Sequence, residues 1–383
     1  MEYKRIEEFA TVVTGGTPST AKSEYWDDGN IPWLQSGCCQ NCDVDTVEKY
    51  ITQEGYDNSS TRMMPPNTVM IALTGATAGK VGYLKFEACG NQSITGIFPC
   101  DSMNQRYLFY YLLSQRKKIL ADCVGGAQTH ISQSYVKKIQ VPMLPLIEQE
   151  KIVEVLTKLS NVISKRQDEI IVIDDLIKAR FVEMFGDPVS NPYGYDKVAL
   201  SDLADIKIGP FGSLLHKEDY IEGGHPLLNP SHIMDGKISP DDKLTISDEK
   251  YEELSAYQLK TGDVVMGRRG EMGRCAVVSE EGFLCGTGSI LIRTKGEVTA
   301  DYIQKIISFP SFKKTIEDMA VGQTMPNLNV PIVASFQIIK PPMEVQDSYY
   351  AFVEQVDKSK VAVQKALTET QLLFDSLMQQ YFG

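Results

Sequence analysis

The sequence contains the same pattern twice, about 195 residues apart. One long helical stretch begins at Pro145–Gln149 and ends at Phe185–Gly186; another begins at Pro342–Gln346 and ends at Phe382–Gly383. The offset is 197 residues at the first proline, at the glutamine and at the final glycine. Repetition at a fixed period indicates two copies of one structural unit. Two such copies predict a pseudo-two-fold molecule that can bind two sites held at a fixed distance.

The length and the repeat together predict two globules and two long helices. A chain of 383 residues exceeds one compact domain and can form two hydrophobic cores. We expect a first globule over residues 1–145, a helix over 146–186, a second globule over 187–341 and a helix over 342–383. The expected fold class is α+β, with two tandem mixed α/β domains that are each followed by a long helix.

Each globule has the same expected order of a buried strand, a Gly-rich turn, a second strand and a helix. In the first globule these segments are 69–73, 75–79, 81–84 and 105–121. In the second they are 262–266, 270–273, 275–278 and 302–316. The offset between matching segments drifts from 194 to 197 residues, as small insertions in a diverged duplication would produce.

The two helical stretches have the apolar spacing of a coiled-coil seam. In the first, apolar residues recur at steps of four and three with a skip at 166: Ile152, Leu156, Leu159, Ile163, Ile170, Ile173 and Ile177. Polar interruptions fall at Arg166 and Arg180 in the first stretch, but at Lys360 and Thr370 in the second. Staggered interruptions suit two different helices that pack together, and they disfavour self-pairing of either one. The alternative is two separate amphipathic helices, each lying on its own globule.

Bulk properties restrict the cellular setting and the class of partner. The net charge of −12 argues against a nonspecific nucleic-acid binder, although it leaves room for local basic patches. The polar start at residues 1–5 and the shortness of the densest apolar run, 170–173, predict a cytoplasmic protein that does not enter the membrane. Cys38, Cys39 and Cys42 form a cluster, but no second pair of zinc ligands follows. Free thiols are therefore the favoured interpretation of the cysteines, and we expect no metal site.

Two motifs suggest enzymatic chemistry and fail on inspection. Gly75–Lys80 resembles a phosphate-binding loop, but it is one residue short and leads into an expected strand instead of a helix. Asn191–Tyr193 resembles the active-site motif of amino-methyltransferases, but it lacks the second proline and reads as a helix-terminating turn. No catalytic constellation is evident among the scattered histidines and carboxylates. We expect a non-catalytic recognition or scaffold protein without a cofactor.

Basic and polar residues on the Gly-rich turns are candidates for contact with DNA. Arg268, Arg269 and Arg274 surround the second turn together with Glu271. Arginine binds guanine edges and phosphates in a bidentate manner. Two roles are open to Glu271: it accepts a hydrogen bond from cytosine, or it simply pairs with an arginine. The first turn offers Thr74, Thr77 and Lys80, and Lys137 and Lys138 would suit phosphates. The alternative is a set of solvated surface charges.

The tail of each globule carries the most specific sequence signal. In the first copy it comprises Gly125–Ser132, Val136–Pro142 and Leu144–Gln149; in the second, Val321–Asn329, Phe336–Ile339 and Pro341–Pro342. Early Gly turns stand at Gly15–Ser19 and Gly209–Ser213. On these segments the whole chain resembles the specificity subunit of Type I restriction-modification systems, although Glu344–Gln346 departs from the usual Glu-Gln. The resemblance adds Thr17, Ser19, Gln128, Ser213 and Gln323 to the DNA-binding candidates.

The resemblance implies a division of labour between subunits. Each globule would be a target-recognition domain for one half of a split, asymmetric double-stranded DNA target, and the helices would pair antiparallel and set the gap. Two adenine methyltransferase subunits and ATP-dependent restriction subunits would dock on this chain and supply the chemistry. The alternatives are a recognition subunit of another multi-subunit modification system, an enzyme that binds ATP or a methyl donor, and a coiled-coil adaptor that does not bind DNA.

Overall fold

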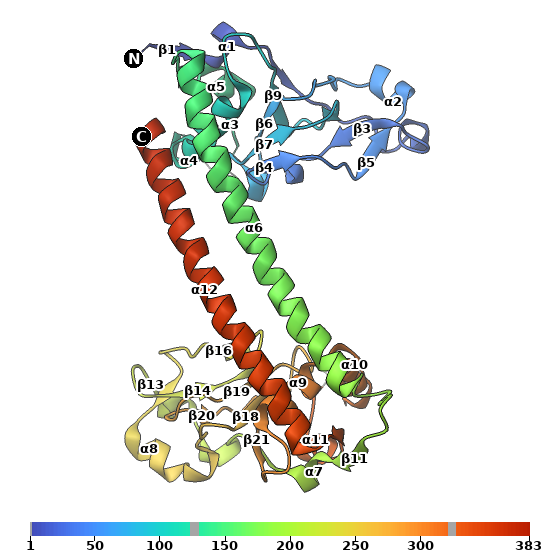
Figure 1. Cartoon of the computed structure of the whole chain (residues 1–383), viewed down its shortest axis with the longest axis vertical. Coiled ribbons are helices and arrows are strands. Elements are labelled where there is room, and N and C mark those ends of the chain that lie inside the picture. The colour runs from blue at the N-terminus through green and yellow to red at the C-terminus, as the bar shows by residue number, and fades with distance from the viewer. Residues whose placement is uncertain (1, 123–129, 321–326) are drawn as a thin grey trace. The chain divides into compact units, whose positions relative to one another are not determined.

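The computed structural model describes residues 2–122, 130–320 and 327–383 (Figure 1). The chain forms two compact units. Unit 1 comprises Met1–Glu169 and Ala362–Gly383, and unit 2 comprises Ile170–Val361. Each unit therefore combines one globule with parts of both long helices.

Unit 1 is organised around a five-stranded sheet with the order β2-β9-β6-β7-β4. Its strands are Val12–Thr14 (β2), Ile94–Ile97 (β9), Val69–Ala72 (β6), Val81–Leu84 (β7) and Cys42–Val44 (β4). A three-stranded sheet contains Lys49–Ile51 (β5), Ile31–Leu34 (β3) and Cys89–Gly90 (β8), and Tyr3–Arg5 (β1) pairs with Gln140–Pro142 (β10). Strand β6 is buried on both faces, because Val69 and Ile71 enter one core whereas Met70 and Ala72 enter another.

The short helices of unit 1, apart from Gln53–Asp57, contribute residues to the core that contains Val69 and Ile71. They are Ile6–Phe9 (α1), Gln53–Asp57 (α2), Gln105–Ser114 (α3), Arg116–Asp122 (α4) and Gln133–Lys138 (α5). Tyr107, Leu108 and Leu112 of α3 are fully buried against β6 and β7. The helix expected over 105–121 is thus two helices, separated at Gln115.

Unit 2 repeats this plan with a four-stranded sheet of order β12-β21-β18-β19. Its strands are Ala204–Ile208 (β12), Ser289–Thr294 (β21), Val264–Gly267 (β18) and Cys275–Val277 (β19). The other strands are Tyr220–Ile221 (β13), Thr245–Ile246 (β17), His225–Leu228 (β14), Leu284–Cys285 (β20), Asp196–Ala199 (β11), Gln337–Lys340 (β22), Ile233–Met234 (β15) and Lys237–Ile238 (β16). Strand β11 pairs with β22 as β1 pairs with β10, so the two units share a common skeleton.

The helices of unit 2 are Leu200–Leu203 (α7), Asp248–Glu253 (α8), Ala300–Ser308 (α9), Pro310–Met319 (α10) and Val330–Ala334 (α11). The single helix expected over 302–316 was wrong, because the chain starts a new helix at Pro310. Proline lacks the N–H that would continue α9, but its fixed φ suits the first position of a helix. Short 3-10 helices occur at Ser23–Tyr25 (η1), Ser36–Cys38 (η2), Gly75–Thr77 (η3), Gly212–Leu214 (η4), Lys217–Asp219 (η5), Pro230–His232 (η6) and Ser255–Tyr257 (η7).

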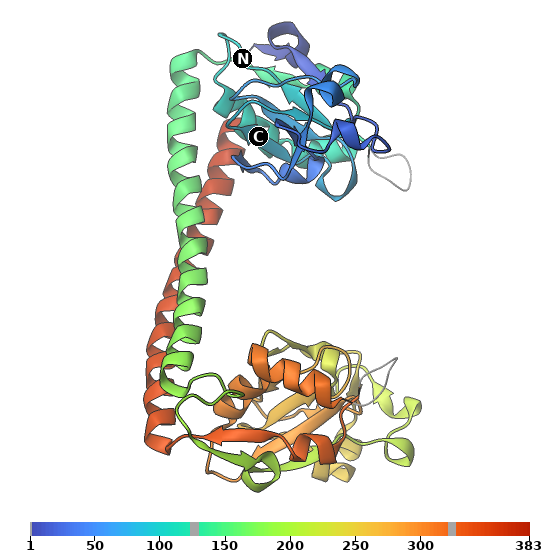
Figure 2. The same ribbon diagram turned by 90° about the vertical axis from the view of Figure 1, so that its right-hand side faces the viewer.

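Two helices of 40 residues each, Leu146–Phe185 (α6) and Met343–Phe382 (α12), pair antiparallel within each unit (Figure 2). In unit 2, Lys360 pairs with Asp174, and Tyr349 packs further along α6 against Phe185, with ring centroids 5.3 Å apart. In unit 1, Phe374, Met378 and Phe382 of α12 enter the same core as Ile152 and Leu156 of α6. The coiled-coil prediction is confirmed. The alternative of two helices that each lie on their own globule is wrong, because the end of α12 packs into the core of the first globule.

The polar interruptions of the seam find partners inside the helix pair. Arg166 donates hydrogen bonds to the Thr370 hydroxyl and to the Ala366 carbonyl oxygen in unit 1. Lys360 donates to the Asp174 carboxylate in unit 2. Three of the four staggered polar positions thus hydrogen-bond between the two unlike helices. The fourth, Arg180, donates instead to Glu183 of its own helix, 2.8 Å away.

A buried glutamine ties the start of each long helix to its globule. In unit 1, Gln149 accepts a hydrogen bond from the Asn104 backbone N–H (2.8 Å) and donates to the Leu144 carbonyl oxygen (2.8 Å). In unit 2, Gln346 accepts from the Thr299 N–H (3.2 Å) and donates to the Pro341 carbonyl oxygen (3.1 Å). Both glutamines have no exposed surface. The repeated glutamine, offset by 197 residues, thus marks a repeated structural contact. Among the described residues, no helix is both long enough and apolar enough to span a bilayer.

Candidate nucleic-acid interface

The early Gly turn of each unit is fixed by backbone packed against backbone. A Cβ atom on Gly15 would lie 2.0 Å from the Gly90 carbonyl oxygen, and one on Gly209 would lie 2.0 Å from the Gly286 carbonyl oxygen. The Gly16 N–H donates to the same Gly90 oxygen, 2.8 Å away. Only glycine fits where these segments touch. The repeated glycine therefore holds the exposed residues that follow it, Thr17 among them, in a defined place.

The second Gly-rich turn of each unit joins two antiparallel strands. Gly75 and Gly79 have φ values of 72° in unit 1, and Gly270 and Gly273 have φ values of 80° and 74° in unit 2. These are left-handed conformations that favour glycine. Strand β7 follows the first turn directly, whereas a phosphate-binding loop leads into a helix. The tight-turn interpretation of Gly75–Lys80 is confirmed.

In unit 2, the early Gly turn and the Gly-rich turn between β18 and β19 are both held by the consecutive residues Thr287 and Gly288. Thr287 donates from its hydroxyl to the Pro210 carbonyl oxygen (2.8 Å), and Gly288 accepts from the Arg268 N–H (3.0 Å). The segment after residue 326 joins them, because Leu328 donates its N–H to the Arg268 carbonyl oxygen (2.9 Å). Segments that lie far apart in the sequence therefore meet at one end of the sheet.

Unit 1 brings the equivalent segments together. The Thr17 hydroxyl hydrogen-bonds the Gln92 side chain, and the Leu73 N–H donates to the Ser93 carbonyl oxygen (2.8 Å). Thr74 forms an isolated antiparallel bridge with His130, just as Arg269 does with Asn327. The predicted candidates on the early turn and on the strand turn thus belong to one surface in each unit.

The arginine cluster of unit 2 divides into bound and free side chains. Arg274 donates to the Glu271 carboxylate (2.8 Å) and to the Pro230 carbonyl oxygen (3.1 Å), and Lys313 also donates to Glu271 (3.0 Å). The hydrogen bonds that Glu271 accepts from Arg274 and Lys313 lower its pKa below the usual value, and the bond from Arg274 is the larger cause. Glu271 is therefore an ionised tether for Arg274.

The remaining two arginines differ in exposure. Arg268 is half-buried and donates from Nε to Asn327 (3.0 Å), and its pKa is lowered by burial and by the neighbouring Arg269. Arg269 is exposed, and among the residues that the structure describes it has no ion-pair or side-chain hydrogen-bond partner. Arg269 is thus the cation of this cluster that is available for a ligand.

The same surface in unit 1 is polar and carries less charge. Lys80 donates to Gln40, and the Thr77 hydroxyl lies 3.5 Å from the Thr74 carbonyl oxygen. The Ser19 carbonyl oxygen accepts from the Trp26 indole, 3.1 Å away. The two units thus present different side chains on a common backbone arrangement.

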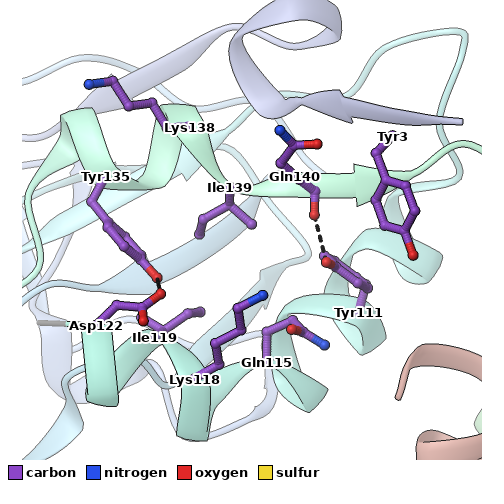
Figure 3. Close-up of a pocket in the computed structure, with 10 residues that line it drawn as sticks. All are labelled: Tyr3, Tyr111, Gln115, Lys118, Ile119, Asp122, Tyr135, Lys138, Ile139 and Gln140. Atoms are coloured by element: carbon purple, nitrogen blue, oxygen red, sulfur yellow. Dashed lines mark hydrogen bonds between the residues drawn. The ribbon is translucent and has the colours of Figure 1, made fainter.

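The predicted lysine pair on α5 lies elsewhere in unit 1. Lys138 and Lys118 line a hollow of about 240 Å³ whose walls include Tyr3, Tyr111 and Ile139 (Figure 3). The turn candidates are absent from its lining. Tyr135 donates to Asp122 (2.8 Å) across this hollow, so that carboxylate is engaged. Lys118 and Lys138 therefore form a second basic site, whose lining contains none of the turn residues. Lys137 precedes Lys138 on α5 and is not part of this lining.

Two of the predicted DNA-binding residues, Gln128 and Gln323, lie outside the described residues. Ser213 is exposed on η4. Cys39 is buried and Cys42 exposed, and the hydrogen bond with Cys38 and burial raise the pKa of the Cys39 thiol. In the described parts of the chain, no group of three or more His, Cys, Asp or Glu side chains is placed to hold a metal ion.

Sequence reasoning missed three residues of this surface. Thr287 and Asn327 hold Pro210 and Arg268. Thr287 lies in no motif that the sequence singled out, whereas Asn327 lies in the Val321–Asn329 tail segment but was not chosen as a site residue. Phe211 is 63% exposed on the early turn of unit 2. Its place between Pro210 and Gly212 was a signal, because an apolar side chain on a Gly-Pro turn cannot join a strand's buried face.

Comparison with known proteins identifies the fold and the family to which the sequence is similar. The sequence model described as the Type I restriction modification DNA specificity domain matches residues 1–172 and 192–371. The MjaIX specificity subunit of Methanocaldococcus jannaschii is 24% identical over an alignment that covers 98% of this chain and 91% of that protein. The EcoR124I/EcoR124II specificity subunit of Escherichia coli is 31% identical, but the match covers 41% of this chain and 40% of that protein.

Solved structures show the same fold. The S subunit of a Type I restriction-modification system from M. genitalium superposes with a TM-score of 0.58 at 16% identity, covering 100% of this chain and 96% of that one. A chain from a study of the assembly and conformational transition of the Type I system gives a TM-score of 0.60 at 15% identity, with coverages of 100% and 97%.

Proposed function

This chain belongs to the family of Type I restriction-modification DNA specificity proteins, and on that premise we propose that it recognises a split, asymmetric DNA target. The observation that carries the proposal is the repeated surface of converging turns, with one copy in each unit. Thr17, Thr74 and Lys80 occupy it in unit 1, whereas Phe211, Arg268 and Arg269 occupy it in unit 2. Different side chains on equivalent backbones are expected to select different bases, so the two half-targets are unlike.

Side chains on the turns would contact bases, and lysines would contact phosphates. Exposed Arg269 can make the bidentate contact with guanine, while Asn327 and Glu271 hold the neighbouring Arg268 and Arg274 in place. Lys137 and Lys138 would bind the sugar-phosphate backbone. The full set of proposed DNA contacts is Thr17, Ser19, Thr74, Thr77, Lys80, Gln128, Lys137, Lys138, Ser213, Arg268, Arg269, Glu271, Arg274 and Gln323.

The helix pair would set the number of unread base pairs between the half-targets. Helices α6 and α12 are each 40 residues long, and each unit contains part of both. The polar contacts Arg166–Thr370 and Asp174–Lys360 support a single register, because a shift would leave these groups facing apolar residues. In domain terms, we propose target-recognition domains at 1–145 and 187–341 and spacer helices at 146–186 and 342–383.

The long helices also offer surface for partner subunits. Ile171, Val172 and Leu176 in unit 2 and Leu372 and Leu373 in unit 1 are all at least 48% exposed, although they are apolar. Apolar residues that gather on the outside of a helix pair indicate a protein interface. We propose that two adenine methyltransferase subunits dock there, that ATP-dependent restriction subunits join the complex, and that this chain itself catalyses no reaction. Such a complex would work in the cytoplasm.

The test is to co-express the chain with an adenine methyltransferase subunit and to map methylated adenines in a random-sequence plasmid library by long-read sequencing. The expected result is one split motif with two unlike halves and a fixed gap. Arg269→Ala should relax base preference in one half only, whereas Lys237→Ala, which removes an exposed cation from β16 of the same unit, should leave the motif intact. An assembled complex that methylates no motif and retains no DNA sequence-selectively would favour an adaptor without DNA-binding function.

A further inference from the structure

Phe211 is an aromatic side chain presented to solvent on the early turn of unit 2. It is 63% exposed, and Leu214 in the same turn is 39% exposed. A single exposed apolar residue is common on protein surfaces and indicates nothing by itself. What distinguishes Phe211 is the rigidity of its support and the identity of its neighbours.

The backbone immediately before Phe211 is anchored by several contacts. Proline at position 210 restricts φ, and the Pro210 carbonyl oxygen accepts a hydrogen bond from the Thr287 hydroxyl at 2.8 Å. Gly209 lies against Gly286 so closely that a Cβ atom would not fit, and its N–H donates to the Ser289 carbonyl oxygen at 3.1 Å. The ring is therefore held outward by a fixed turn, which reduces the entropy lost when it binds a ligand.

The same short segment also supports the cationic turn. Thr287 holds the Phe211 turn, and the next residue, Gly288, accepts from the backbone N–H of Arg268 at 3.0 Å. Arg269, the exposed and unpaired cation among the described residues of this cluster, follows directly. The Phe211 ring and the Arg269 guanidinium group thus lie on two turns that are held by the adjacent residues Thr287 and Gly288. This combination suits a nucleic acid, which offers apolar base surface beside anionic phosphate.

From this arrangement we propose that Phe211 makes an apolar contact with one base of the half-target that unit 2 recognises. The inference rests on the proposed function and deepens it. The base surface involved is either a thymine methyl group in the major groove or the face of an unstacked base. The equivalent position in unit 1, offset by 194 residues, is Thr17, whose hydroxyl is engaged with Gln92. Unit 1 therefore lacks the contact at this position, and the effect of removing it is confined to one half of the target.

The test uses the complex of the full chain with its methyltransferase subunit and compares the methylation motifs of Phe211→Ala, Phe211→Leu and wild type. Phe211→Ala should reduce discrimination at one or two adjacent positions of a single half-target by about tenfold, and Phe211→Leu by less, because apolar surface is retained. The matched control is Ile221→Ala, which removes a 43% exposed apolar side chain from β13 of the same unit and should leave the motif unchanged.

A second arm leaves the protein intact and changes the DNA. Uracil in place of thymine removes the methyl group, and an abasic site removes the base surface. Weaker binding with uracil at the Phe211-dependent position supports contact with a methyl group, whereas a loss seen only with the abasic site supports stacking. If wild type has a split motif and neither Phe211→Ala nor any modified base changes recognition, the inference is wrong. It is equally wrong if Phe211→Ala prevents assembly with the methyltransferase, since Phe211 would then be a protein contact. A wild-type complex without a motif would instead refute the proposed function.

Discussion

The indole Nε1 of Trp33 donates a hydrogen bond to the carbonyl oxygen of Gly16, 3.0 Å away, and so ties a buried aromatic ring to the early turn of unit 1. Trp26 donates to Ser19 at the other end of the same turn, and the two indole rings pack edge to face at 5.0 Å. The chain has two tryptophans, and both contact this turn. Tryptophan emission is therefore a probe of one proposed half-site and not of the other.

Tryptophan fluorescence should respond to the half-target of unit 1 alone. We expect the emission of this chain to change with DNA that carries this half, because a ligand on the Gly15–Ser19 turn alters the polarity around both indoles. DNA that carries only the other half should leave the spectrum unchanged. Thr17→Ala should weaken the response without changing the emission of the free protein. A response that follows the half-target of unit 2 would contradict the assignment of this turn to DNA.

Gly15→Ala should destabilise unit 1 by about 1–3 kcal/mol, because a Cβ atom would overlap the Gly90 carbonyl oxygen and force the two segments apart. Gly37→Ala is the matched control, since a Cβ atom there meets nothing within 4 Å. The midpoints of urea unfolding of the two variants give the comparison. Equal midpoints for Gly15→Ala and wild type would show that the turn can move without loss.

Gln149→Leu should cost about 1–3 kcal/mol, because it leaves the Asn104 N–H and the Leu144 carbonyl oxygen without their side-chain partner. Glu150→Leu makes the same kind of change on the exposed side of the same helical turn and should have a much smaller effect. Thermal unfolding of both variants measures the difference. If the two substitutions are equivalent, the buried glutamine does not hold α6 to its globule.

A double-mutant cycle of Arg166→Leu and Thr370→Val should give a coupling energy of about 0.5–3 kcal/mol, because the two side chains hydrogen-bond inside the helix pair. The exposed pair Glu154 and Lys158, 2.6 Å apart on one face of α6, serves as the control and should couple more weakly, because solvent screens it. Denaturant unfolding of each single and double variant supplies the energies. If the coupling energy between Arg166 and Thr370 is no larger than that of the control pair, this contact does not select the register of the helix pair.

The tether at Glu271 predicts a pH dependence in the acid range. Its pKa is lowered in the folded state by Arg274 and Lys313, so the stabilisation is present above the ordinary carboxyl pKa of 4.5 and is lost as the pH falls through the folded value. The stability difference between wild type and Glu271→Gln should therefore be constant at neutral pH and shrink below about pH 4.5. Unfolding measured across this range tests it, and a difference that grows on acidification would contradict the tether.

Glu271→Gln should also alter DNA binding. Loss of the carboxylate removes the ion-pair partner of Arg274 and Lys313, so nonspecific affinity should rise and its salt dependence should steepen by about one to two counterions. Target discrimination in the half read by unit 2 should fall, because the hydrogen bond to the Pro230 carbonyl oxygen holds Arg274 less firmly by itself.

Much of the fold followed from local pattern. The strand–turn–strand units predicted at 69–84 and 262–278 are present, because alternating burial and left-handed glycines act over a few residues. The coiled-coil pairing followed from apolar spacing and staggered polar positions. The uninterrupted helices expected over 105–121 and 302–316 were wrong, since each is two helices. For the second, the signal that Pro310 begins a new helix was present in the sequence.

The side-chain contacts of the candidate DNA-binding surface were harder to predict from the sequence than the fold. The sequence left open whether Glu271 contacts a base or an arginine, and the structure shows it bound to Arg274 and Lys313. Lys313 comes from a helix that begins about 40 residues later in the chain, so its part in this cluster depends on tertiary packing. Phe211 was not singled out although Pro210 and Gly212 flank it, because the exposure of a turn residue is decided by the folded surface.

The sequence by itself determined that the chain is a duplicated unit of a globule and a helix, and it identified the family, because repeats, Gly turns and apolar spacing are local and survive divergence. Only the tertiary structure decided which segments meet. The order β12-β21-β18 places Gly209, Arg268 and the segment at Thr287–Gly288 at one end of a sheet. The physical reason is that strand order is set by burial and backbone hydrogen bonding over the whole unit, which no short window of sequence contains.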